Sequence, residues 1–109
     1  MNALEKMLTE VLTVGLPAIS HWSTSIPGAP VPTITVDDDD DGIEYEITPA
    51  LVAEGLLAVV FGEPSDMALT PSTRCVVRDR FFGRSDRSFD PEEADEILQV
   101  ALFGEVNWL

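Results

Sequence analysis

Five consecutive aspartates at positions 37–41 form the densest group of potential metal ligands or charged binding residues in the chain. Two glutamates follow shortly after them. The acidic candidates for binding a partner are Asp37, Asp38, Asp39, Asp40, Asp41, Glu44 and Glu46. Adjacent carboxylates can coordinate a cation, imitate the phosphates of a nucleic acid, or keep a loop solvated. The residues alone leave these three roles open.

A calcium site of the EF-hand type is only half present. Asp37, Asp39 and Asp41, with Gly42 after them, match the first half of the EF-hand loop. The closing position, which should be a bidentate glutamate, is Thr48, and prolines replace the helix that should precede the loop. We therefore expect no metal site and no cofactor.

Mimicry of nucleic acid agrees with the charge of the chain. There are 20 acidic and 6 basic residues among 109, for a formal net charge of −14. Such a charge opposes contact with nucleic acid and anionic membranes and favours a basic partner. Because duplex DNA carries one charge per roughly 1.7 Å of axis, a dense acidic face can occupy a protein groove that otherwise binds DNA.

Neither His21 nor Cys75 has a spacing that predicts catalysis. A histidine base needs a nucleophile and an orienting carboxylate, and no motif places a serine in that arrangement. Cys75 precedes Val76 and Val77, which favours a small core residue. We expect a structural or surface histidine, a core cysteine and no catalytic residue.

Five of the six basic residues form what we term the arginine strip: Arg74, Arg78, Arg80, Arg84 and Arg87. This strip can pair with the aspartates of the same chain or form a separate contact surface. The negative charge of the rest of the chain argues against direct binding of nucleic acid.

The elements that position these residues are predicted to be mostly helical. Apolar residues with helical spacing predict a first helix from residue 4, and Gly15 and Pro17 are expected to end or kink it. Three more helices are predicted where a capping residue precedes proline, at Thr48, Thr70 and Asp90. Asp90 and Glu93 predict a capping box.

Two short strands are predicted at residues 33–36 and 43–47, with the aspartates at the tip of the resulting hairpin. Ile43, Tyr45 and Ile47 alternate with acidic residues, which is typical of a half-buried strand. Residues 23–32 contain three prolines and are expected to be a loop. The predicted fold class is α+β, a mostly helical single domain over residues 1–109 with one short β-hairpin.

The apolar C-terminus follows the last predicted helix. Phe103, Val106 and Trp108 are expected either to pack on the core or to form a second interface. The single cysteine excludes an internal disulfide, and neither a signal peptide nor a membrane span is predicted. These features predict a cytoplasmic protein without membrane contact and leave its oligomeric state open.

Two stretches resemble small uncharacterised proteins of tailed phages and prophages. "EILQVALFGEV" (96–106) is similar to their closing Gln-x-Ala-Leu-Phe-Gly-Glu run, and "EITPALVAEGL" (46–56) is similar to an earlier stretch. This chain ends in Asn-Trp-Leu, whereas those relatives end in Val-Tyr-Gly. The resemblance carries over no catalytic or binding residue, and it implies a phage or mobile-element origin.

These observations predict a protein that is not an enzyme. We expect a non-catalytic acidic interaction protein that binds and inhibits a basic, nucleic-acid-handling host or defence protein by mimicry of nucleic acid. The alternative is a small phage structural or assembly protein that acts as an oligomer through its apolar C-terminus. A contiguous acidic face would favour the first function, and a large apolar patch would favour the second.

Overall fold

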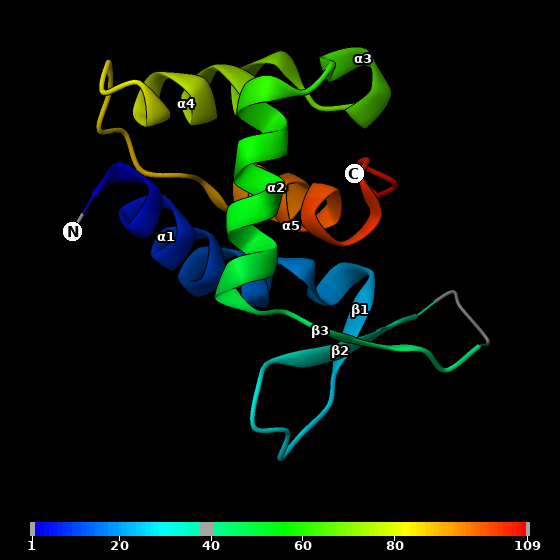
Figure 1. The fold of residues 1–109 in the computed structure, drawn as a ribbon. Helices are drawn as coiled ribbons and strands as arrows, with labels where there is room; N and C mark the ends of the chain where they lie inside the picture. Colours follow the sequence, from blue (N-terminus) through cyan, green and yellow to red (C-terminus); the bar gives the residue numbers. More distant parts are fainter. Residues whose placement is uncertain (1, 38–40, 109) are drawn as a thin grey trace.

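The last helix, α5 (Pro91–Phe103), lies at the centre of the fold and packs against α1 (Ala3–Ala18) and α2 (Pro49–Phe61). The computed structural model describes residues 2–37 and 41–108. Figure 1 shows the helices stacked in one part of the molecule and a small sheet extending from its other end. The fold is α+β and mostly helical, which confirms the predicted fold class.

Two of the predicted caps begin helices as expected. The Thr48 side chain accepts a hydrogen bond from the Leu51 N–H at 3.1 Å, at the start of α2. At the start of α5, Asp90 accepts from the Glu93 N–H at 2.8 Å, and the Glu93 side chain accepts from the Asp90 N–H at 3.0 Å. The capping box is therefore confirmed.

The third predicted cap has a different partner. Helix α4 (Pro71–Phe81) begins after Thr70, but the Thr70 side chain accepts no hydrogen bond from the helix backbone. Its hydroxyl instead donates to Glu96 Oε2 at 3.0 Å. A hydrogen bond to an ionised carboxylate is stronger than one between neutral groups, so a partner on α5 replaces the local cap.

Helix α1 continues through Gly15 and Pro17, where the sequence predicted an end or a kink. Pro17 lies in the last turn, so its missing N–H removes a single bond near the end of the helix. Gly15 is buried against α5, and a Cβ built there would lie 2.7 Å from Leu98 Cδ1. The glycine therefore serves the contact between two helices and does not terminate the first.

Three antiparallel strands form the sheet in the order β1-β2-β3. They are β1 (Ser23–Ser25), β2 (Thr33–Val36) and β3 (Glu44–Glu46). The predicted β2–β3 hairpin is confirmed, but β1 lies in the segment that was predicted to be a loop. Its three polar residues carry no alternating pattern, and pairing with β2 places Ser23 opposite Val36.

One face of the sheet packs on the helical core. Ile34 is 2% exposed, and the ring of Tyr45 meets Phe103 edge-on with 5.4 Å between centroids. Ile43 is 48% exposed, which corrects the prediction that it shares the half-buried face of Tyr45 and Ile47. The reason is that Ile43 precedes the first paired residue of β3.

A further short helix, α3 (Pro64–Met67), was not predicted, because four residues are too few to show a helical period. It connects α2 to the segment before α4, and Met67 is buried. The Met67 carbonyl accepts a hydrogen bond from the Val106 N–H at 2.7 Å. The chain after α5 therefore returns along the helical part of the molecule. None of the described helices is long and apolar enough to span a membrane.

Candidate functional site

Four of the seven predicted acidic binding residues lie in the described part of the β2–β3 hairpin, and all four are exposed: Asp37, Asp41, Glu44 and Glu46. Glu44 and Glu46 pair with threonines of β2. Side chains alternate along a strand, so both glutamates lie on the face opposite Tyr45. The other three aspartates, at positions 38–40, lie outside the described residues, and their role stays a prediction.

Asp37 joins this acidic hairpin to the segment that follows α1. Its backbone N–H donates to the Trp22 carbonyl at 3.0 Å, and its carboxylate accepts a hydrogen bond from the Thr24 hydroxyl at 2.5 Å. Trp22 directly follows the 3-10 helix η1 (Ile19–His21). The acidic hairpin is therefore a close neighbour of His21 in the fold.

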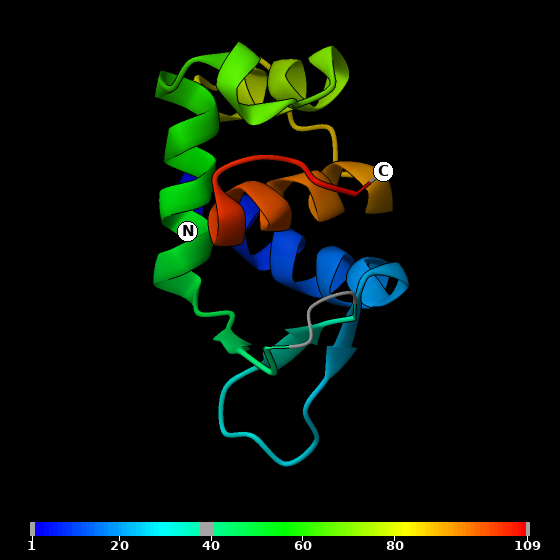
Figure 2. The same cartoon turned by 90° about the vertical axis from the view of Figure 1, so that its right-hand side faces the viewer.

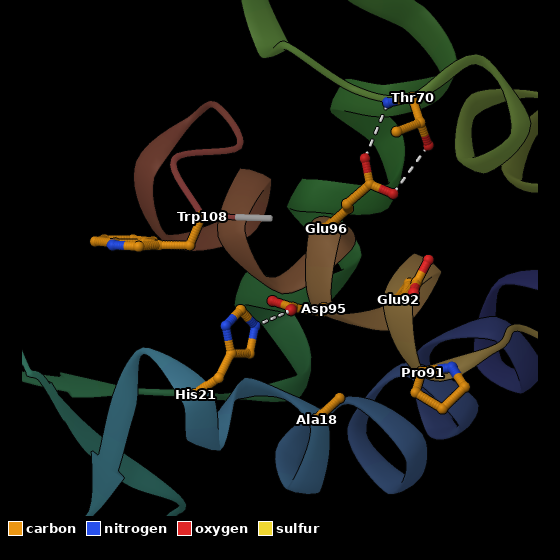
Figure 3. Close-up of a pocket in the computed structure, with 8 residues that line it drawn as sticks. All are labelled: Ala18, His21, Thr70, Pro91, Glu92, Asp95, Glu96 and Trp108. Atoms are coloured by element: carbon orange, nitrogen blue, oxygen red, sulfur yellow. Dashed lines mark hydrogen bonds and ion pairs between the residues drawn. The ribbon is translucent and has the colours of Figure 1, made fainter.

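A pocket of about 490 Å³ lies beside His21, between the end of α1, the first turns of α5 and the C-terminal tail (Figure 3). Its lining consists of Ala18, His21, Thr70, Pro91, Glu92, Asp95, Glu96 and Trp108. Three of these eight side chains are carboxylates, and none is a lysine or an arginine. The pocket and the hairpin are thus both acidic.

Asp95 holds the inner wall of the pocket together. Its Oδ1 accepts hydrogen bonds from Trp22 Nε1 at 2.8 Å and from Gln99 Nε2 at 2.9 Å. Its Oδ2 lies 2.6 Å from Nε2 of His21, whose side chain is 43% exposed. Because an ionised carboxylate only accepts hydrogen bonds, Nε2 of His21 is the donor in this contact.

Glu96 is the second buried carboxylate of the pocket. Its Oε1 accepts from the Thr70 N–H at 2.9 Å, and its Oε2 accepts from the hydroxyls of Thr70 and Thr73. Glu96 is 6% exposed. These three donors hold the side chain in one orientation and anchor the start of α4 to α5.

Gln99 fixes the C-terminal tail beside the pocket. Its Oε1 accepts hydrogen bonds from the N–H groups of Asn107 and Trp108 at 2.7 and 2.8 Å. Its Nε2 donates to the Trp108 carbonyl at 2.7 Å as well as to Asp95. The tail therefore has a defined course in the absence of any partner.

The residues predicted as a possible second interface pack against the protein itself. Val106 is 9% exposed, and the ring of Trp108 stacks on Trp22 with 4.9 Å between centroids. Phe103 meets both tryptophan rings edge-on. This packing gives the apolar tail a role within the fold, and its use as an interface between chains stays a prediction.

The arginine strip does not form one basic surface. Arg80 is 7% exposed; its Nη2 lies 2.5 Å from Glu10, and its guanidinium lies 4.7 Å from the centre of the Phe89 ring. The hydrogen bond from Arg80 holds the pKa of Glu10 below its ordinary value of 4.5, although burial opposes this shift. Two further ion pairs join Arg84 to Asp79 and Arg87 to Glu93.

The site has part of the arrangement of a histidine base. Asp95 orients His21, but the nearby hydroxyls have other partners: Ser23 donates to the Ile19 carbonyl at 2.8 Å, and Thr70 donates to Glu96.

Cys75 is exposed, which corrects its predicted place in the core. The buried face of α4 is formed by Thr73, Val76, Val77 and Arg80. Among the described residues no group of acidic, histidine or cysteine side chains could hold a metal ion. The arrangement is suited to binding a cationic group.

A comparison of the chain with protein-family models, curated proteins and solved structures found no match. The site is therefore interpreted from its geometry and charge.

Sequence spacing did not predict the roles of the pocket residues Asp95 and Glu96, or of Gln99, which donates a hydrogen bond to Asp95. All three are buried, although they are polar residues in a helix whose apolar spacing was recognised. The available signal was their position among apolar residues, since polar side chains are buried in a core only when they have partners. Those partners, such as His21, are too distant in sequence to be identified from spacing.

Proposed function

We propose that this protein is a non-catalytic acidic interaction protein of phage or mobile-element origin. It binds a basic, nucleic-acid-handling protein of the host or of a defence system and inhibits it by occupying the nucleic-acid site. The resemblance of residues 96–106 to phage-encoded proteins supports the origin. The charge and its distribution support the chemistry of the partner.

The observation that carries the proposal is the exposed acidic hairpin. Glu44 and Glu46 lie side by side on the outer face of the edge strand β3, with no ion pair to another described residue. The ion pairs of the described residues join α1, η1, α4, α5 and the loop before α5. Three of the five arginines of the strip are thus paired within the helical part of the molecule, and none of these pairs reaches the hairpin.

An exposed carboxylate pair favours a partner that supplies positive charge. Charge complementarity raises the association rate and selects against partners of the wrong sign. A protein surface that binds DNA offers this charge as rows of lysine and arginine directed at phosphates. Such a surface is the class of partner that the acidic hairpin fits best.

Competition with duplex DNA tests the proposal. The protein would be used to capture binding proteins from a host lysate, and each purified candidate would be tested for DNA binding with and without this protein. We expect at least one captured DNA-binding protein to release DNA as this protein is added. If every captured protein binds DNA and this protein at the same time, inhibition by mimicry is excluded.

The competition assay needs a matched pair of variants. The double change Glu44→Gln and Glu46→Gln removes two charges from the hairpin and should weaken competition severalfold. The double change Glu63→Gln and Asp66→Asn removes the same charge near α3, at the opposite end of the molecule (Figure 1). If the two double variants compete equally, the hairpin is not the binding surface.

A further inference from the structure

We propose that the pocket beside His21 binds the guanidinium group of an arginine side chain presented by the basic partner. This inference rests on the proposed function, and it adds a specific recognition site to the general attraction of the acidic hairpin. The site is formed by Glu92, Asp95 and Glu96 at the start of α5, with Ala18 and Pro91 as apolar walls (Figure 3).

The inner carboxylates are already oriented before a ligand arrives. Asp95 and Glu96 are 7% and 6% exposed, and each accepts three hydrogen bonds from the protein. A carboxylate has about four lone-pair sites, so roughly one acceptor position remains on each. Because these side chains are already fixed, ordering them adds little to the entropic cost of binding a ligand.

Glu92 supplies the acceptor capacity that the inner carboxylates lack. It is exposed, and no hydrogen bond or ion pair to another described residue occupies its carboxylate. Together the three carboxylates can receive several donors from different directions. A guanidinium presents five N–H donors in a planar fork, whereas an ammonium presents three on one atom. The distribution of acceptors therefore favours arginine over lysine.

The pocket can also accept the rest of an arginine side chain. Its volume of about 490 Å³ leaves space for the methylene stem, which the apolar side chains of Ala18 and Pro91 can cover. No lysine or arginine lines the pocket to repel the ligand, and Nε2 of His21 is directed at Asp95. The site is thus complementary to arginine in charge, donors and apolar surface.

The position of the pocket relates it to the acidic hairpin. Asp37 donates its N–H to the carbonyl of Trp22, and His21 of the pocket is the preceding residue. The Asp37 end of the hairpin is therefore joined to the segment that borders the pocket. Figure 2 shows η1, the first turn of α5 and the C-terminus on one side of the molecule, with α2 on the other side.

Titration with a small probe tests the inference without the partner. The probe is N-acetyl-arginine amide, and its controls are N-acetyl-citrulline amide, which has the same shape without charge, and N-acetyl-lysine amide. The reporter is the indole N–H signal of Trp22 in a proton–nitrogen NMR spectrum, because this N–H donates to Asp95. Trp108→Phe assigns it by leaving a single indole signal.

We expect a saturable shift of the Trp22 indole signal with the arginine probe, a weaker effect with the lysine probe and none with the citrulline probe. Equal shifts with arginine and lysine probes would overturn the choice of guanidinium. Equal shifts with arginine and citrulline probes, or no shift with any probe, would overturn the site itself.

Two variants locate the binding in the pocket. Glu92→Gln should lower the affinity for the arginine probe roughly two- to fivefold, the range expected from one exposed charge pair. Ala18→Leu should narrow the pocket without changing charge and should also weaken binding. Glu54→Gln on α2 removes the same charge away from the pocket and should leave the affinity unchanged (Figure 2).

The outcomes of this titration and of the DNA competition are separable. If the probe fails to bind while Glu44 and Glu46 still control competition with DNA, the pocket inference is wrong and the proposed function stands. If the probe binds in the pocket but no captured protein is displaced from DNA, the arginine site stands and inhibition by mimicry is wrong.

Discussion

Gln99 is fully buried, and its side-chain amide connects α5, Asp95 and the C-terminal tail. Every donor and acceptor of this amide has a partner, which is the condition under which a polar group is tolerated in a core. The amide also fixes Trp108, which stacks on Trp22. Gln99 thus fixes Asn107 and Trp108 beside α5, in addition to the bond between Val106 and Met67.

Replacing Gln99 with methionine should therefore cost more than a typical core substitution. The change keeps the volume but leaves the N–H groups of Asn107 and Trp108 without their acceptor. We expect a loss of at least about 2 kcal/mol in the free energy of unfolding, measured by urea denaturation. Asn107→Ala is the control, because only the backbone N–H of Asn107 bonds to Gln99. Equal stability of the two variants would contradict this role.

The ion pair between Glu10 and Arg80 predicts a dependence of stability on pH. The hydrogen bond from Arg80 lowers the pKa of Glu10 in the folded state. The ion pair therefore contributes fully to the free energy of unfolding at pH values above 4.5, the ordinary pKa of this group. It is lost as the pH falls through the lower pKa of the folded state. The change Glu10→Gln should lower the free energy of unfolding by about 1–3 kcal/mol at pH 7.

The difference between the parent protein and the Glu10→Gln variant should shrink as the pH is lowered below 4.5. Urea denaturation at a series of pH values measures it. Glu5→Gln, an exposed change on the same helix, should have little effect at any pH. A Glu10→Gln difference that stays constant down to pH 3 would show that the carboxylate charge is not what stabilises Arg80.

At the scale of elements, the contact between α2 and α5 depends on a glycine. A Cβ built on Gly55 would lie 2.6 Å from the Cβ and 2.9 Å from the Cα of Ala101. In an exposed helix, replacing glycine with alanine stabilises by roughly 0.5–1 kcal/mol. At this contact the helices would have to move apart, so the sign of the effect should reverse.

We predict that Gly55→Ala destabilises the protein by about 1–3 kcal/mol, as expected for overpacking in a core. Thermal denaturation provides the measurement. The control is a double variant that also carries Ala101→Gly, which removes the clashing methyl group and should recover part of the loss. Two results would refute this account of the helix contact. One is a Gly55→Ala variant that is more stable than the parent, and the other is a double variant that loses more stability than the two single variants added together.

The elements also show what the sequence could and could not predict. Local signals were sufficient for the capping box of Asp90 and for the hairpin of alternating residues, because both depend on neighbours within a few positions. The partner of Thr70 was not predictable, since Glu96 lies 26 residues away. The same limit explains the missed contact of His21 with Asp95, which are 74 residues apart.

At the scale of the whole molecule, charges of opposite sign are used in different places. The arginine strip is drawn into the helical part, where Arg80, Arg84 and Arg87 each pair with a carboxylate. The hairpin, by contrast, exposes its acids at one end of a molecule that extends 41 Å along its longest axis. This separation leaves an acidic surface at the hairpin, although the chain also contains five arginines between residues 74 and 87.

We expect this acidic surface to steer the protein to a basic partner. The most direct measurement is the association rate with the captured partner at two salt concentrations, for the parent protein, for the Glu44→Gln, Glu46→Gln variant and for the Glu63→Gln, Asp66→Asn variant. Charges are screened over about 8 Å at physiological salt, so the parental rate should fall as salt rises. The hairpin variant should associate more slowly and depend less on salt, while the α3 variant should resemble the parent. A hairpin variant that associates at the parental rate, with no effect of salt, would contradict this expectation.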